Sequence, residues 1–272
     1  MNGKVCVVTG AASGIGQQLC IELAKQGAVV VAAARDEARA AEAVKAIIAA
    51  AGPQAKVEAL ACDVASVSSM KRACATLTAR HPKLHLLVNN AAVFNKERRT
   101  SADGLELGYA VNALAPFVLS TLLLDALKAG APSRIVNMTM APTQPLDFDD
   151  LQLERKYSPL KALQSTKSGH QYLTAALAKR LDGTGVSVVT VNPGLTQSKL
   201  PTEAPLPLRL IFRLFGKTPA NGAKVPLSAC LDAKWSSGVF ISDKGAATPM
   251  PPFIEDVAAR RYMETNAKLA GL

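Results

Sequence analysis

Three glycines that directly follow an apolar run constrain the fold of this chain more than any other feature. The run, Val5 to Val8, is typical of a buried strand, and Gln17 to Gln26 have the apolar spacing of an amphipathic helix. The connection between them contains Gly10, Ser13, Gly14, Ile15 and Gly16. The first glycine permits a tight turn, the second lets backbone N–H groups approach an anion, and the third lets the helix pack closely. A strand, a glycine turn and a helix in this order predict a pyrophosphate-binding site.

The spacing of these glycines, Thr-Gly-x-x-x-Gly-x-Gly, resembles that of the short-chain dehydrogenase/reductase family. Other segments similar to family landmarks follow in the family's order over nearly the whole chain. Asp63-Val64 resembles a pair that contacts adenine, and Asn90-Ala91 resembles part of the family's Asn-Asn-Ala-Gly segment. Pro193-Gly194 with Ser198 is similar to a Pro-Gly-x-x-x-Thr segment that holds the nicotinamide carboxamide, with serine in place of threonine. The resemblance implies that these residues bind a nicotinamide cofactor.

The end of the second predicted strand, Val29 to Ala34, bears on which cofactor is bound. An acidic side chain at this point would accept hydrogen bonds from a ribose 2′-hydroxyl. The chain instead has Ala34 followed by Arg35, a cation that suits a 2′-phosphate. Asp36 precedes the helical segment Glu37 to Ala51, and we interpret it as the N-cap of that helix. The sequence therefore predicts NADP(H) as the cofactor.

The residues expected to carry the chemistry depart from the family's pattern. In that family a lysine lowers the pKa of a tyrosine that transfers the proton, while a serine hydroxyl holds the substrate oxygen. By resemblance, Lys167 is this lysine and Asn112 is the asparagine that orders a water beside it. The tyrosine position holds Leu163, and the serine position holds Met140. Thr139 precedes Met140, and because successive strand side chains point to opposite faces, it takes the serine's role only if the strand has already ended.

A second Tyr-x-x-x-Lys spacing begins at Tyr157 and offers an alternative. Pro159 suits the first position of a helix and Ser158 suits its cap, so we expect Tyr157 to lie before that helix. The stretch from Asp147 to Lys161 resembles the retinol-dehydrogenase-like branch of the family, in which this first tyrosine is not the acid. Two further candidates for a catalytic role are His170 and Tyr109.

Apolar segments near residues 5, 29, 57, 84, 134 and 186 alternate with helical segments along the chain. We expect a last strand at Trp235 to Phe240 and a closing helix from Phe253 to Leu272. This alternation predicts an α/β Rossmann-type fold, a doubly wound parallel sheet in a three-layer αβα arrangement. A length of 272 residues with 49% apolar content suits one domain, residues 1–272, without an internal linker.

The stretch from Leu206 to Lys217 is strongly apolar, with Arg209 and Arg213 four residues apart. It lies within residues 197–225, the region in which the resembled family places its mobile substrate lid. We interpret it as a hydrophobic lid over a lipophilic ligand. Contact with a membrane surface and a homodimer patch are the alternatives.

Composition narrows the partners and the compartment. The net charge of +10 is dispersed among helical segments and aromatic residues make up 4%, so we expect a basic surface and no nucleic-acid site. Five scattered cysteines suggest buried free thiols of a reducing compartment, and no His or Cys spacing indicates a metal site. Because the first strand begins at Val5, no room is left for a signal peptide, and we expect a cytoplasmic protein.

These patterns leave three functions open. The first is an NADP(H)-dependent oxidoreductase for a hydrophobic alcohol, ketone or polarised double bond, in which Lys167, Asn112 and either Thr139 or water replace the missing hydroxyls. The second is a non-redox catalyst, such as a cyclase or isomerase, or a binding protein for a lipophilic substrate, with a structural cofactor. The third is a cofactor-sensing regulator.

Overall fold

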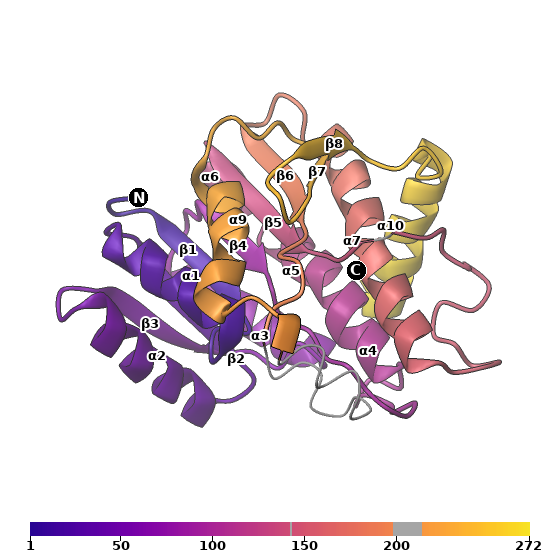
Figure 1. The fold of residues 1–272 in the computed structure, drawn as a ribbon, viewed down its shortest axis with the longest axis horizontal. Helices are drawn as coiled ribbons and strands as arrows, with labels where there is room; N and C mark the ends of the chain where they lie inside the picture. Colours follow the sequence, from indigo (N-terminus) through magenta and orange to yellow (C-terminus); the bar gives the residue numbers. More distant parts are fainter. Residues whose placement is uncertain (142, 198–213) are drawn as a thin grey trace.

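The computed structural model describes residues 1–141, 143–197 and 214–272 as an α/β fold around one eight-stranded sheet (Figure 1). The strand order is β3-β2-β1-β4-β5-β6-β7-β8, and all neighbouring strands are parallel except β7 and β8. This is a doubly wound sheet, because the chain proceeds outward in one direction from β1 and in the other direction from β4. In chain order the strands are β1 Val5–Thr9, β2 Val29–Ala34, β3 Lys56–Ala61, β4 Leu86–Asn89, β5 Ser133–Met138, β6 Val186–Val191, β7 Val239–Ile241 and β8 Ala247–Pro249.

Helices cover both faces of the sheet, as the sequence predicted, and give three layers. The helices are α1 Gly14–Lys25, α2 Glu37–Ala51, α3 Val67–Arg80, α4 Leu107–Tyr109, the π-helix η1 Ala110–Leu114, α5 Ala115–Leu122, α6 Leu124–Ala129, α7 Pro159–Arg180, α9 Pro219–Leu231 and α10 Asp256–Ala270. Within the ranges described, no helix combines the length and apolar character needed to cross a bilayer.

Alternating side chains of the sheet enter two separate apolar cores. Val5 and Val7 of β1 pack in a cluster with α3, α5, α7 and α10, whereas Cys6 and Val8 pack with α1, α2 and α9. The strand is buried on both faces, which explains why it appears in the sequence as an uninterrupted apolar run. All five cysteines are buried free thiols, as predicted.

The predicted boundaries are confirmed for β2 and α2, while others shift. The first helix begins at Gly14 rather than Gln17, and the closing helix begins at Asp256. The strand expected from Trp235 to Phe240 is wrong in its first residues, since β7 begins at Val239. The Trp235 indole donates a hydrogen bond to the Ser228 carbonyl of α9 at 3.0 Å, so this residue belongs to the helix packing and not to the sheet.

Arg134, at the start of β5, ties the end of α9 to the sheet. Its guanidinium donates to the carbonyl oxygens of Ala229 (2.9 Å), Asp232 (2.8 Å) and Trp235 (3.2 Å). Its Nε donates to the Ser187 hydroxyl at 2.9 Å. One side chain therefore satisfies three backbone acceptors that follow or end a helix.

We expect Arg134→Met to lower the free energy of unfolding by about 2 kcal/mol, because the three carbonyls lose a charged donor. Urea unfolding followed by circular dichroism measures this difference. Arg72→Met, which removes an exposed cation from α3, is the control and should change stability by no more than about 0.5 kcal/mol. Equal stability of the two variants would contradict the structural role of Arg134.

Candidate active site

The predicted cofactor residues gather at one edge of the sheet, where the parallel strands end. Gly10 follows β1, Arg35 follows β2, Asp63 lies just after β3, Asn90 follows β4, and Pro193 lies just after β6. β1 and β4 are neighbours from which the chain winds in opposite directions. In open α/β sheets, ligands bind outside the carboxyl ends of the strands at such a switch point.

The glycine turn is shaped by close backbone contacts. Gly10 and Gly14 have positive φ angles of 67° and 60°. A Cβ atom on Gly16 would lie 2.4 Å from the Gly10 carbonyl oxygen and 2.5 Å from Asn90 Nδ2, so no other residue fits. Ser13 precedes α1 in an extended conformation, and its side chain makes no capping hydrogen bond. The first-turn N–H groups of α1 therefore lack a side-chain cap, which suits an anion such as pyrophosphate.

Asn90 and Ala91 are fastened to the glycine turn through Thr9. Asn90 Nδ2 donates to the Thr9 carbonyl at 2.8 Å, and the backbone N–H groups of Asn90 and Ala91 donate to the Thr9 hydroxyl at 2.9 Å and 3.0 Å. The segment after β4 is thereby held against the end of β1. Asp63 is engaged locally, because its Oδ1 accepts from the Ala65 N–H at 3.0 Å, while Val64 packs against the core.

The two charged residues after β2 separate as the sequence predicted. Asp36 Oδ1 accepts from the Arg39 N–H at 2.8 Å, which confirms Asp36 as the N-cap of α2. Arg35 is exposed at the carboxyl end of β2. Its guanidinium is thus placed at the rim of the candidate site.

The segment after β6 turns sharply. Gly194 has a φ of 75°, and its N–H donates to Asn192 Oδ1 at 2.9 Å, directly beside Pro193. Ser198 and the central part of the predicted lid, residues 198–213, lie outside the described residues. The lid between residues 197 and 225 therefore stays a prediction.

Lys167 of α7 is buried, and its side chain is bonded to the backbone of β5. Its Nζ donates to the Met138 carbonyl at 2.8 Å, and it forms no ion pair within the described ranges. Burial lowers the pKa of Lys167 from its ordinary value to about 7. The protonated and the neutral form of the Lys167 amine are therefore both populated near neutral pH.

Thr139 lies beside Lys167, but its hydroxyl already donates a hydrogen bond within the fold. β5 ends at Met138, so the strand has ended before Thr139. This is the condition under which Thr139 could take the serine's role. The Thr139 hydroxyl donates to the Lys167 carbonyl at 2.6 Å and is buried. In this arrangement Thr139 holds the α7 backbone. Met140 follows it and is partly exposed.

Asn112 lies in the π-helix η1 and has the buried partners that its sequence position required. Its Oδ1 accepts from the Val93 N–H at 2.8 Å, and its Nδ2 donates to the Val93 carbonyl at 2.9 Å and to the Thr166 hydroxyl at 3.3 Å. The Thr166 hydroxyl in turn donates to the Ala162 carbonyl at 2.7 Å, with the Leu163 carbonyl at 3.1 Å. Asn112 and α7 are thus joined one residue from Lys167, with Leu163 partly exposed one turn earlier.

His170, a candidate named from the sequence, lies at this junction. Its Nε2 donates to the Asn112 carbonyl at 2.5 Å, and its Nδ1 is buried without a partner within the described structure. Burial first, and then the nearby Lys167, lower the pKa of His170 well below its ordinary value. The imidazole is therefore neutral and stabilises the π-helix.

The two other tyrosine candidates lie elsewhere. Tyr157 precedes α7, as Ser158 and Pro159 predicted, and its hydroxyl donates to the Asn95 carbonyl at 3.0 Å. Tyr109 is buried, and its hydroxyl donates to Asn266 Oδ1 of α10 at 3.0 Å.

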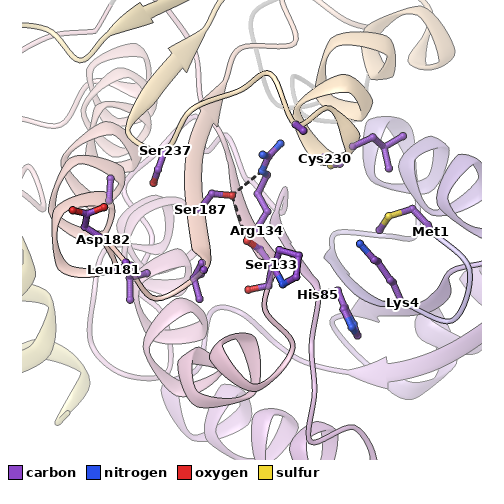
Figure 2. A pocket seen from close by; sticks show the side chains of 17 residues that line it. Met1, Lys4, His85, Ser133, Arg134, Leu181, Asp182, Ser187, Cys230 and Ser237 are labelled. Atoms are coloured by element: carbon purple, nitrogen blue, oxygen red, sulfur yellow. Dashed lines mark hydrogen bonds between the residues drawn. The ribbon is translucent and has the colours of Figure 1, made fainter.

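A pocket of about 460 Å³ lies at the opposite edge of the sheet (Figure 2). It is lined by residues at the amino ends of the strands, including Lys4, His85, Arg134 and Ser187. Figure 2 shows Arg134 in its centre with its Nε bonded to Ser187, and the same guanidinium also binds three carbonyls. The Arg134 guanidinium is therefore occupied by hydrogen bonds within the fold. The carboxyl edge of the sheet remains the candidate site.

The depressed pKa of Lys167 makes stability depend on pH. Between pH 7 and 10 the unfolded chain carries a proton on Lys167 that the folded chain lacks, so stability rises with pH over this window. The free energy of unfolding of the wild type, minus that of Lys167→Met, should rise by up to about 1.4 kcal/mol per pH unit. Urea unfolding at pH 7, 8, 9 and 10 measures it. Lys161→Met, at an exposed position of α7, is the matched control, and a flat difference for Lys167→Met would show that Lys167 remains charged in the folded protein.

Comparison with known proteins shows to which family this chain belongs. The sequence model of the short chain dehydrogenase family matches residues 4–206. Retinol dehydrogenase 14 of mouse is 33% identical over 293 residues, covering 100% of this chain and 87% of its own length. Human retinol dehydrogenase 12 is 35% identical over 278 residues, covering 99% and 87%.

Solved structures share the fold. The NADPH-bound carbonyl reductase from chicken fatty liver has a TM-score of 0.69 at 23% identity, covering 92% of this chain and 100% of that chain. An uncharacterised protein from Mycobacterium paratuberculosis has a TM-score of 0.77 at 23% identity, covering 99% and 94%. The family match and the relatives together show that the chain belongs to the short-chain dehydrogenase/reductase family, in its retinol-dehydrogenase-like branch.

Proposed function

We propose that this chain binds NADP(H) at the carboxyl edge of its sheet and acts as an oxidoreductase on a hydrophobic alcohol, ketone or polarised double bond. The observation that carries the proposal is the glycine turn, where the absence of a Cβ on Gly16 brings the uncapped first turn of α1 against the end of β1. Membership of a dehydrogenase family with retinol dehydrogenases as relatives supports the reaction class.

The choice of NADP(H) rests on Arg35. This exposed cation directly follows Ala34, the position at which an acidic residue would bind a ribose 2′-hydroxyl, and Asp36 is occupied as the cap of α2. The first-turn N–H groups of α1 would hold the pyrophosphate, and the residues from Pro193 to Ser198 would face the carboxamide. The bound cofactor supplies or accepts hydride.

The proton is handled without the family's usual pair of hydroxyls. Leu163 and Met140 occupy the positions of the tyrosine and serine, and neither side chain can donate a proton. Lys167 lies one turn from Leu163, and because its pKa is about 7, its Nζ can hold or release a proton at neutral pH. Asn112, fixed by Val93 and Thr166, would position a water between this amine and the substrate.

The apolar character of Leu163 and Met140 favours one second candidate. A pocket without a hydroxyl donor suits a non-redox reaction of a lipophilic substrate, such as a cyclisation or isomerisation, with the cofactor as a structural element. Mass spectrometry of products formed from hydrophobic carbonyl compounds separates the two. A change of two hydrogens supports the oxidoreductase, and an isomer of unchanged mass supports the alternative.

Cofactor preference tests the role of Arg35. NADPH should bind more tightly than NADH by roughly 1–3 kcal/mol, because Arg35 makes a charge-assisted contact with the 2′-phosphate. Calorimetric titration of the wild type and Arg35→Ala measures this preference, which the variant should lose. Arg39→Ala, one turn further along and paired with Asp36, is the control that keeps it. Equal affinity of the wild type for both cofactors would refute the assignment.

Restoring the two hydroxyls tests the positions of Leu163 and Met140. The double variant Leu163→Tyr, Met140→Ser should create or raise ketone reduction, since general acid catalysis is worth about 10²–10⁴-fold. NADPH absorbance with a panel of hydrophobic ketones provides the assay, and adding Lys167→Ala to the double variant should remove the gain. A wild type that reduces ketones rapidly and loses this activity on Tyr157→Phe would place the active site on the other tyrosine.

A further inference from the structure

A second pocket, of about 550 Å³, is lined by residues of α7 and of the segments around β7 and β8. Its walls include Phe240 of β7 and Met250 and Phe253 from the segment between β8 and α10. Gln171 of α7 and Ala141, which follows β5, also line it. Figure 1 shows that β7, β8 and α7 are neighbours at this end of the sheet. A pocket of this size suits a small lipophilic molecule.

Gln171 is the unusual member of this lining. Gln171 is 1% exposed, yet its Oε1 has no hydrogen-bond partner within the described structure. Buried amides are nearly always paired, and an unpaired one opposes folding. The surrounding side chains are apolar or weakly polar, and no lining residue is charged. The pocket thus offers one buried amide in a lining that is otherwise apolar or weakly polar.

The position of Gln171 links this pocket to the chemistry. It follows Lys167 by four residues, so the two side chains lie one turn apart on the same face of α7. Ala141 directly follows Met140 in the chain. A molecule in the pocket would therefore extend away from Lys167 along α7, with Gln171 at a distance from the reacting carbon.

We propose that this pocket holds the apolar body of the substrate and that Gln171 binds a second, non-reacting hydroxyl group on it. That the molecule in this pocket is the substrate rests on the proposed function. A hydroxyl matches an amide because each group can both donate and accept. The uncharged lining disfavours a carboxylate or an ammonium, which would be buried without a counter-charge. The substrate class is then a lipophilic alcohol or ketone with an additional hydroxyl.

A matched pair of probes tests the polar contact. Equilibrium dialysis with 2-naphthol and naphthalene, which differ by one hydroxyl, should show roughly 3- to 10-fold tighter binding of 2-naphthol to the wild type. Gln171→Met keeps the length of the side chain and should abolish this preference, whereas Gln18→Met on α1 should retain it. Equal binding of the two probes by the wild type, or a preference that survives in Gln171→Met, would overturn the inference.

Stability gives a readout that needs no ligand. Because the buried Gln171 Oε1 lacks a partner among the described residues, Gln171→Met should raise the melting temperature by roughly 2–4 °C. A lower melting temperature would show that the amide serves the fold, and would overturn the inference.

NADPH titration of the same proteins separates the two proposals. A hydroxyl preference without NADPH binding refutes the proposed function but keeps the pocket, and NADPH binding without the preference refutes only the pocket.

Discussion

The contact between Gly16 and the Gly10 carbonyl is the constraint on which the rest of the site depends. A Cβ at position 16 would lie 2.4 Å from that oxygen, so only glycine allows α1 to begin directly against the end of β1. The same space admits Asn90, which holds the end of β4 to Thr9. The switch point of the sheet and the positive end of α1 are brought together by this one packing condition.

Buried polar side chains that are bonded to backbone groups surround Lys167. Thr139, Asn112 and His170 each make short hydrogen bonds to backbone groups near this lysine. These contacts hold the amine of Lys167 in a buried environment, which brings its pKa to about 7. A framework that positions a lysine need not include a tyrosine.

The sequence predicts features that local patterns encode. The glycine spacing, the cap at Asp36 and the helix start at Pro159 each depend on a few adjacent residues, and the structure confirms all three. The partner of Lys167 could not be predicted, since the Met138 carbonyl is 29 residues away and has no side-chain signature. The unpaired amide oxygen of Gln171 could not be predicted either, because a missing partner is a property of the packed molecule.

Amide hydrogen exchange with and without NADPH tests the central claim, that the cofactor lies at the carboxyl edge, and it requires no known substrate. Saturating NADPH should slow exchange in the glycine turn and the first turn of α1, residues 10–17, and in the segment around Asn90. Peptides that contain Lys4 or Arg134, at the amino edge of the sheet, should be unchanged. Protection at the amino edge, or an unaltered glycine turn when NADPH is bound, would contradict this account.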